Sequence, residues 1–187
     1  MQVELLARYL QPAESLLDVG CGAGTLGQAL VEGIGVTVSG LETHIRDGCV
    51  IPVDHYDGRT FPHPDNSFDS VLLADMLHHE EDPGRVLREA ARVARRRVVV
   101  KDHKVDGPLA HPRICLFDWA ANAGYDIPCL FRYPTLEGWH ALFRECALET
   151  GAEQRSINLY PAGLNLLFGR RLQYLAVLEP ARASNPS

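Results

Sequence analysis

The residues best suited to hold a charged ligand lie at positions 18–24, where the sequence reads Asp-Val-Gly-Cys-Gly-Ala-Gly. This run follows a short apolar stretch, Leu16 to Val19, and precedes a stretch with helical apolar spacing, Thr25 to Val31. Glycines let the backbone turn sharply and let a ligand approach it without Cβ atoms in the way. The pattern therefore predicts a glycine loop between a buried strand and a helix, a common cofactor site in α/β proteins.

Two classes of cofactor fit this loop. Residues 22–27 match the dinucleotide fingerprint, and Glu42 follows at about the spacing of a ribose-binding acid. Asp18 favours a different ligand, because a carboxylate would repel a pyrophosphate but would attract the ammonium group of a methionine moiety. A chain of 187 residues is also short for a dinucleotide domain with a separate substrate domain. We therefore favour S-adenosylmethionine, with a nicotinamide cofactor as the alternative.

A second group of polar residues follows two later apolar stretches. His78 and His79 come after the stretch Phe68 to Ala74, and Asp102 comes after the stretch Arg97 to Lys101. In open α/β sheets, ligands bind at the edge where the carboxyl ends of the strands meet. A histidine oriented by a carboxylate is a common base for removing a hydroxyl proton. We predict these three residues as catalytic; the alternative is that His78 caps its strand and His79 packs beneath a lid.

The elements that position these residues alternate between strands and helices, which predicts a parallel sheet with right-handed crossovers. We expect strands at 16–19, 36–38, 51–53, 68–74 and 97–101, and helices at 25–31 and from Asp82-Pro83 to Ala94. Pro52 places the third strand at an edge. We also expect a helix over 136–148, capped by Thr135 and stopped by Gly151, and a closing hairpin of strands near 152–158 and 172–178.

The segment 104–143 has a different character, with seven of the 14 aromatic residues of the chain. We interpret it as a lid insertion over the acceptor, within a single domain that spans 1–187 and has a loose tail at 180–187. Four aromatic side chains are predicted to line an apolar acceptor pocket: Trp119, Tyr125, Phe131 and Tyr133. The alternative is that they bury the far end of the sheet.

Composition excludes several other classes of function. A net charge of −6 argues against a general nucleic-acid binder. The one basic run, Arg95 to Arg97, is expected to end a helix, where cations are favourable. No apolar run approaches the ~20 residues of a membrane span. The five cysteines form no CxxC pair, and the histidines outside the motifs lack metal-ligand spacing. We therefore expect a cytoplasmic protein that binds no metal and whose activity survives EDTA.

Further motifs indicate a family. Residues 57–62 read Asp-Gly-Arg-Thr-Phe-Pro, residues 64–69 read Pro-Asp-Asn-Ser-Phe-Asp, and residues 77–79 read Leu-His-His. Together with the glycine loop, Glu42 and the helical stretch 87–93, they resemble the class I S-adenosylmethionine-dependent methyltransferases, especially the ubiquinone-methylase-like group. The resemblance covers about residues 14–102, with a weaker fit at the closing hairpin.

This resemblance implies an α/β, Rossmann-like seven-stranded sheet of order 3-2-1-4-5-7-6, with strand 7 antiparallel and helices on both faces. It also implies methyl transfer to a small organic acceptor, with a hydroxyl favoured over an amine. A non-catalytic scaffold or sensor that binds S-adenosylmethionine is the alternative. Carried over by position, the cofactor-binding residues are Asp18, Gly20, Gly22, Gly24, Glu42, Asp57, Gly58 and the backbone near Asp75.

The sequence departs from this family in two places. Only about eight residues separate Glu42 from Ile51, so the helix usual between strands two and three is shortened or lost. His63 stands where the family has an aromatic or aliphatic residue beside the adenine. Both changes would loosen the adenine side of the site without removing a cofactor contact.

Overall fold

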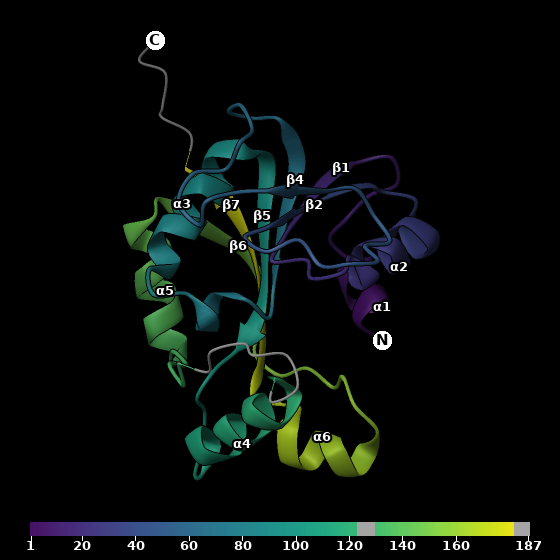
Figure 1. The fold of residues 1–187 in the computed structure, drawn as a ribbon. Helices are drawn as coiled ribbons and strands as arrows, with labels where there is room; N and C mark the ends of the chain where they lie inside the picture. The colour runs from purple at the N-terminus through teal and green to yellow at the C-terminus, as the bar shows by residue number, and fades with distance from the viewer. Residues whose placement is uncertain (123–129, 182–187) are drawn as a thin grey trace.

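The computed structural model describes residues 1–122 and 130–181, which form one seven-stranded sheet of order β3-β2-β1-β4-β5-β7-β6 (Figure 1). The first five strands are mutually parallel, and β7 runs antiparallel to both β5 and β6. The strands are β1 Ser15–Val19, β2 Thr37–Glu42, β3 Val53–His55, β4 Phe68–Ala74, β5 Ala94–His103, β6 Leu148–Gln154 and β7 Gln173–Pro180. The fold class expected from the sequence is confirmed, including the edge position of β3.

Helices cover both faces of the sheet (Figure 1). They are α1 Gln2–Leu6, α2 Thr25–Ile34, the 3-10 turn η1 Leu77–His79, α3 Pro83–Val93, α4 Ala110–Asn122, α5 Leu136–Glu145 and α6 Ala162–Phe168. One apolar core forms beneath α1 and α2, and a larger one forms beneath α3 and α5. Since the central strands are buried on both faces, they are nearly continuous runs of leucine and valine.

Local sequence accounts for the placement of α3. The Asp82 carboxylate accepts a hydrogen bond from the backbone N–H of Arg85, and Pro83 occupies the first turn. The apolar residues of α3 recur at helical spacing, and Val86, Ala90 and Val93 are all buried against the sheet. This helix begins where the sequence predicts.

The basic run Arg95 to Arg97 does not end a helix, and that expectation is wrong. The helix ends at Val93, and Ala94 already has extended backbone angles as the first residue of β5. Arg95 pairs with Asp69 at 2.7 Å, whereas Arg96 and Arg97 both pair with Glu14. The three guanidinium groups therefore neutralise carboxylates at the start of the sheet.

Several other boundaries differ from those expected. The helix α5 is capped by Thr135, whose hydroxyl accepts the N–H of Gly138, but it ends at Glu145. Ala147 takes a positive φ, the chain enters β6 at Leu148, and Gly151 lies at an irregularity inside that strand instead of stopping a helix. The strands expected at 36–38, 51–53 and 152–158 lie at 37–42, 53–55 and 148–154. The segment 43–52 contains no helix, as expected.

The second half of the chain adds α4 and α6, which the sequence did not predict. They lie together beyond the end of the sheet (Figure 1), and the Arg113 guanidinium donates to the Leu167 carbonyl at 2.8 Å. Of the expected tail, residues 182–187 lie outside the described part of the chain. Among the described residues, no helix has the length and apolar character needed to cross a membrane.

Candidate functional site

The glycine loop leaves β1 at the carboxyl edge of the sheet and leads directly into α2. Gly20, Gly22 and Gly24 all have positive φ, between +59° and +80°. A Cβ on Gly20 would lie 2.9 Å from the Cβ of Met76, and one on Gly24 would overlap Ile51. Glycine is therefore required by backbone conformation at all three positions, and by close packing as well at Gly20 and Gly24.

Glu42 ends β2 and lies over this loop. In the parallel register, Val19 of β1 pairs with Leu41 of β2, so Gly20 and Glu42, the next residue along each chain segment, fall at the same edge. The Glu42 Oε1 atom accepts the backbone N–H of Gly22 at 2.5 Å. A half-buried carboxylate therefore stands beside the glycine loop, where the sequence places a ribose-binding acid.

Asp18 is a charged group in an environment that disfavours charge. It is only 2% exposed, and its Oδ2 atom has no hydrogen-bond partner among the described residues. Burial, and next the negative charge of Glu42, raise its pKa from 3.8 to about 7. Buried polar atoms in proteins are normally paired, and an unpaired one calls for an explanation. A ligand cation at this position would satisfy the carboxylate.

The other residues predicted to bind the cofactor are Asp57, Gly58 and Asp75, and they also lie at the carboxyl edge of the sheet. Asp57 is exposed after β3, and its Oδ1 atom accepts the N–H groups of Arg59 and Thr60, which lowers its pKa. Gly58 adopts φ +75° within this turn. Asp75 follows β4 with φ +52°, and both of its carboxylate oxygens lie 2.6 Å from the Lys101 Nζ atom.

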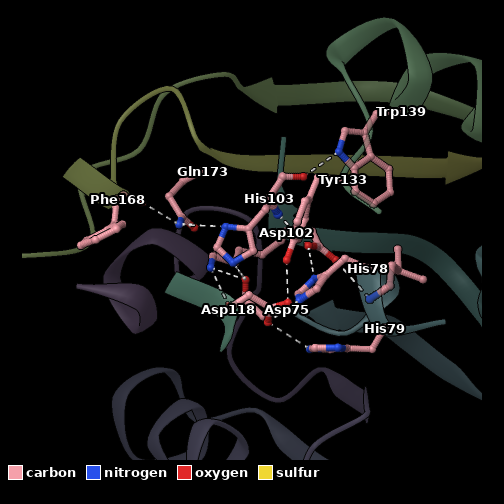
Figure 2. Close-up of polar contacts among 12 residues, drawn as sticks. Asp75, His78, His79, Asp102, His103, Asp118, Tyr133, Trp139, Phe168 and Gln173 are labelled. Atoms are coloured by element: carbon pink, nitrogen blue, oxygen red, sulfur yellow. Dashed lines mark hydrogen bonds and ion pairs between the residues drawn. The ribbon is translucent and has the colours of Figure 1, made fainter. Parts of the chain in front are cut away.

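The predicted catalytic residues come together at the ends of β4 and β5 (Figure 2). The Nδ1 atom of His78 lies 2.6 Å from the Oδ1 atom of Asp102, which is fully buried. Asp102 is fixed in turn by the backbone N–H groups of Leu77 and His103, at 3.1 and 2.6 Å. Asp102 therefore orients the His78 ring. His79 faces a different carboxylate.

That carboxylate belongs to Asp118, which the sequence reasoning did not select. Asp118 projects from α4, and its Oδ1 atom lies 3.5 Å from His78 Nε2 and 3.7 Å from His79 Nε2 (Figure 2). Its other oxygen accepts the Tyr133 hydroxyl at 2.5 Å. The only sequence signal was an acid between Phe117 and Trp119 in an apolar, aromatic stretch.

The charges of this cluster are strongly coupled. Burial lowers the pKa of His78, but the charge of Asp102 and the hydrogen bonds to both aspartates outweigh burial and raise it to about 10. Burial raises the pKa of Asp118, but its hydrogen bonds with His78 and Tyr133 outweigh this and hold it well below its usual range. His78 therefore carries a proton between two carboxylates, whereas the side chain of His79 is 18% exposed.

Two cavities adjoin the cluster. One, of about 290 Å³, lies between Leu77, His78, Tyr133 and Trp139. The other, of about 250 Å³, is lined by Asp75, His78, His79, His103, Phe117, Asp118 and Tyr160.

Of the four aromatic residues expected to line the acceptor pocket, Tyr133 lines the cavity of about 290 Å³ beside His78. Trp119 and Phe131 are 58% and 40% exposed, so that expectation is wrong for them. Tyr125 lies outside the described residues.

Comparison with known proteins identifies the family. The sequence model of the family "Methionine biosynthesis protein MetW" matches residues 1–103, more than half of the chain. The chain belongs to the MetW family. The region shared with MetW includes the glycine loop, Glu42, His78, His79 and Asp102, whereas Asp118 lies beyond it.

This MetW-family chain is also similar in sequence to individual methyltransferases. It is 34% identical over 99 residues to 27-O-demethylrifamycin SV methyltransferase of Amycolatopsis mediterranei, covering 46% of this chain and 36% of that protein. It is 33% identical over 95 residues to ubiquinone biosynthesis O-methyltransferase of Thiobacillus denitrificans, covering 44% and 40%. The matches thus span less than half the length of these curated relatives.

A solved S-adenosylmethionine-dependent methyltransferase from Methanosarcina mazei superimposes with a TM-score of 0.70 at 15% identity, covering 96% of this chain and 98% of that one. The MetW-family chain therefore has the class I methyltransferase fold over nearly its whole length.

Proposed function

We propose that this protein transfers a methyl group from S-adenosylmethionine to a hydroxyl of a small organic acceptor. The observation that carries the proposal is the buried Asp18 carboxylate with its unpartnered oxygen, beside Glu42 and the glycine loop. Such a carboxylate suits a cationic amino acid and would repel a pyrophosphate. When bound, the cofactor supplies a methyl group on a positively charged sulfur that departs as a neutral thioether.

Different residues of the protein would hold different parts of this cofactor. Asp18 would pair with the ammonium group, Glu42 would accept the ribose hydroxyls, and the glycines at 20, 22 and 24 would let the ligand lie against the backbone. Asp57 and Gly58 would contact the adenine, and the backbone near Asp75 would close the pocket. The absence of a helix between β2 and β3 leaves the adenine side less covered.

The acceptor end of the site is proposed to lie at His78, His79 and Asp102. Methyl transfer is an in-line displacement, so the protein mainly has to align the acceptor and exclude water. A hydroxyl also has to lose its proton, and the Asp102–His78 pair next to an accessible His79 supports that task. Because His78 already carries a proton between Asp102 and Asp118, the direct proton acceptor would be His79; alternatively, the histidines would hold a metal ion that acidifies the hydroxyl. Two curated relatives have oxygen-methylating names, which also supports a hydroxyl acceptor.

A small molecule is proposed in preference to nucleic acid as the acceptor. Arg95, Arg96 and Arg97 are each paired with a carboxylate, so this basic run does not form a free phosphate-binding surface.

The proposal is tested by incubating the protein with methyl-deuterated S-adenosylmethionine and a small-molecule cell extract, followed by mass spectrometry. We expect one class of oxygen-bearing metabolite to gain the labelled methyl group, and we expect the Asp18→Asn protein to transfer no label. Cofactor binding without any label transfer would favour the scaffold or sensor function. Label on nitrogen or carbon would overturn the hydroxyl assignment.

A further inference from the structure

The cluster formed by His78, His79 and Asp118 has the composition of a metal site. We propose that these three side chains bind one divalent transition-metal ion, of the zinc, cobalt or iron class, at the acceptor end of the site. This proposal reverses the expectation of no metal, which arose because the ligands do not share a short motif: Asp118 follows His79 by 39 residues. The fold brings α4 against η1 and thereby completes the set.

The distances fit a single ion. The Nε2 atoms of the two histidines lie 3.5 and 3.7 Å from one carboxylate oxygen, and one ligand atom from each residue lies within 4.8 Å of the others. Metal–nitrogen and metal–oxygen bonds of about 2.0–2.2 Å in a tetrahedral arrangement separate neighbouring ligand atoms by roughly 3.3–3.6 Å. Small side-chain movements, with release of the proton that His78 carries between the two carboxylates, would therefore be enough to seat the ion.

The outer contacts of the cluster also follow the pattern of metal sites. Histidine ligands usually direct their second ring nitrogen at a carboxylate or carbonyl, which fixes the nitrogen that faces the metal. Asp102 holds His78 Nδ1 at 2.6 Å in this way and so directs Nε2 at Asp118. The Tyr133 hydroxyl, at 2.5 Å from the second oxygen of Asp118, orients that ligand.

The donor atoms and their surroundings determine the class of ion. Two imidazoles and one carboxylate suit zinc, cobalt, iron or nickel, whereas calcium and magnesium prefer all-oxygen sites. The cavity of about 250 Å³ opens on His78, His79 and Asp118, so positions on the ion would stay open to a substrate atom or water. Three protein ligands with an open position are typical of a catalytic metal site.

A metal ion at this position would deepen the proposed function. The role of the ion rests on the proposed function, whereas the binding of the ion does not. An ion in the cluster would bind the acceptor oxygen and lower the pKa of its hydroxyl, as metals do for bound water, so that the proton would pass to water in the adjoining cavity. The new bond from this oxygen to the methyl carbon would form as the bond from the methyl carbon to the sulfur breaks. Asp102 is then a positioning residue that acts through His78.

The binding test uses the full chain, stripped with EDTA and titrated with ZnCl2 by calorimetry and with CoCl2 by visible absorption. We expect one ion per chain and cobalt absorption bands of a nitrogen- and oxygen-ligated site. Both signals should disappear in His79→Ala and in Asp118→Asn. Asp102→Asn should weaken zinc binding by roughly 10–100-fold. His140→Ala is the matched control, since His140 pairs with Glu153 at 2.9 Å outside the cluster and should leave binding unchanged.

Circular dichroism and S-adenosylhomocysteine binding, measured on the same samples, separate loss of the ion from loss of the fold. If the folded wild-type protein binds no zinc or cobalt, or if His79→Ala and Asp118→Asn bind as the control does, the metal site is wrong. That result would leave the proposed methyl transfer standing whenever the protein still transfers the labelled methyl group. Conversely, stoichiometric zinc binding without label transfer would overturn the function and keep the site.

Discussion

Replacing Asp18 with asparagine should make the cofactor-free protein less sensitive to rising pH. The folded protein holds the pKa of Asp18 at about 7, against 3.8 ordinarily, mainly through burial and next through Glu42. Because the folded pKa of this acid is raised, the folded state binds more protons than the unfolded state between those two values. Stability is therefore lost as pH rises from about 4 to about 7, and the full cost is present above pH 7.

The size of this cost follows from the shift. About three pKa units correspond to about 4 kcal/mol of unfolding free energy at pH 8 and roughly 1.5–2 kcal/mol at pH 5. Asparagine removes the titration, although its amide leaves an unpaired buried group that costs about 1–3 kcal/mol at every pH. The unfolding free energy of Asp18→Asn minus that of wild type should thus be roughly 2.5 kcal/mol larger at pH 8 than at pH 5.

Urea unfolding of the EDTA-treated, cofactor-free proteins at pH 5 and pH 8, followed by circular dichroism, measures this difference. Titrating groups that do not interact with Asp18 are common to both proteins and cancel. If the difference in unfolding free energy between Asp18→Asn and wild type is the same at both pH values, the argument that the folded protein raises the pKa of Asp18 is refuted. The same variant should lose affinity for S-adenosylmethionine, because the charge that opposes folding is the one proposed to bind the ammonium.

Three further substitutions follow from the geometry. Glu42→Ala should weaken S-adenosylhomocysteine binding by about 1.5–3 kcal/mol, the range for hydrogen bonds to a charged group, as measured by calorimetry; an unchanged affinity would remove Glu42 from the site. Gly20→Ala should destabilise the fold by about 1–3 kcal/mol more than Gly35→Ala, because both have positive φ but only Gly20 meets a neighbour; equal thermal shifts would contradict this. His79→Ala should lower turnover of a hydroxyl acceptor by roughly 10²–10⁴-fold with nearly unchanged cofactor affinity, and near-normal turnover would show that His79 is structural.

Features that depend on neighbouring residues could be predicted from the sequence. The glycine loop, the Asp82-Pro83 start of α3 and the limits of β4 are local, and the structure confirms them. The sheet order came from the family resemblance, not from periodicity, and it is confirmed as well.

The errors lie where local signals were ambiguous. No glycine marks the end of α3, so its junction with β5 was placed too late and the arginines were assigned to the helix. Gly151 looked like a helix stop but belongs to an irregular strand. Asp118 was missed because its function depends on a contact with His78 and His79 that only the docking of α4 creates.

The most direct test of the account is a calorimetric titration of the purified protein with S-adenosylhomocysteine and, separately, with NAD. The buried Asp18 and the Glu42–Gly22 contact predict binding of S-adenosylhomocysteine at one site per chain and no heat of binding from NAD. Binding of NAD in preference to S-adenosylhomocysteine would contradict the central claim that this loop accepts a cationic amino-acid nucleoside.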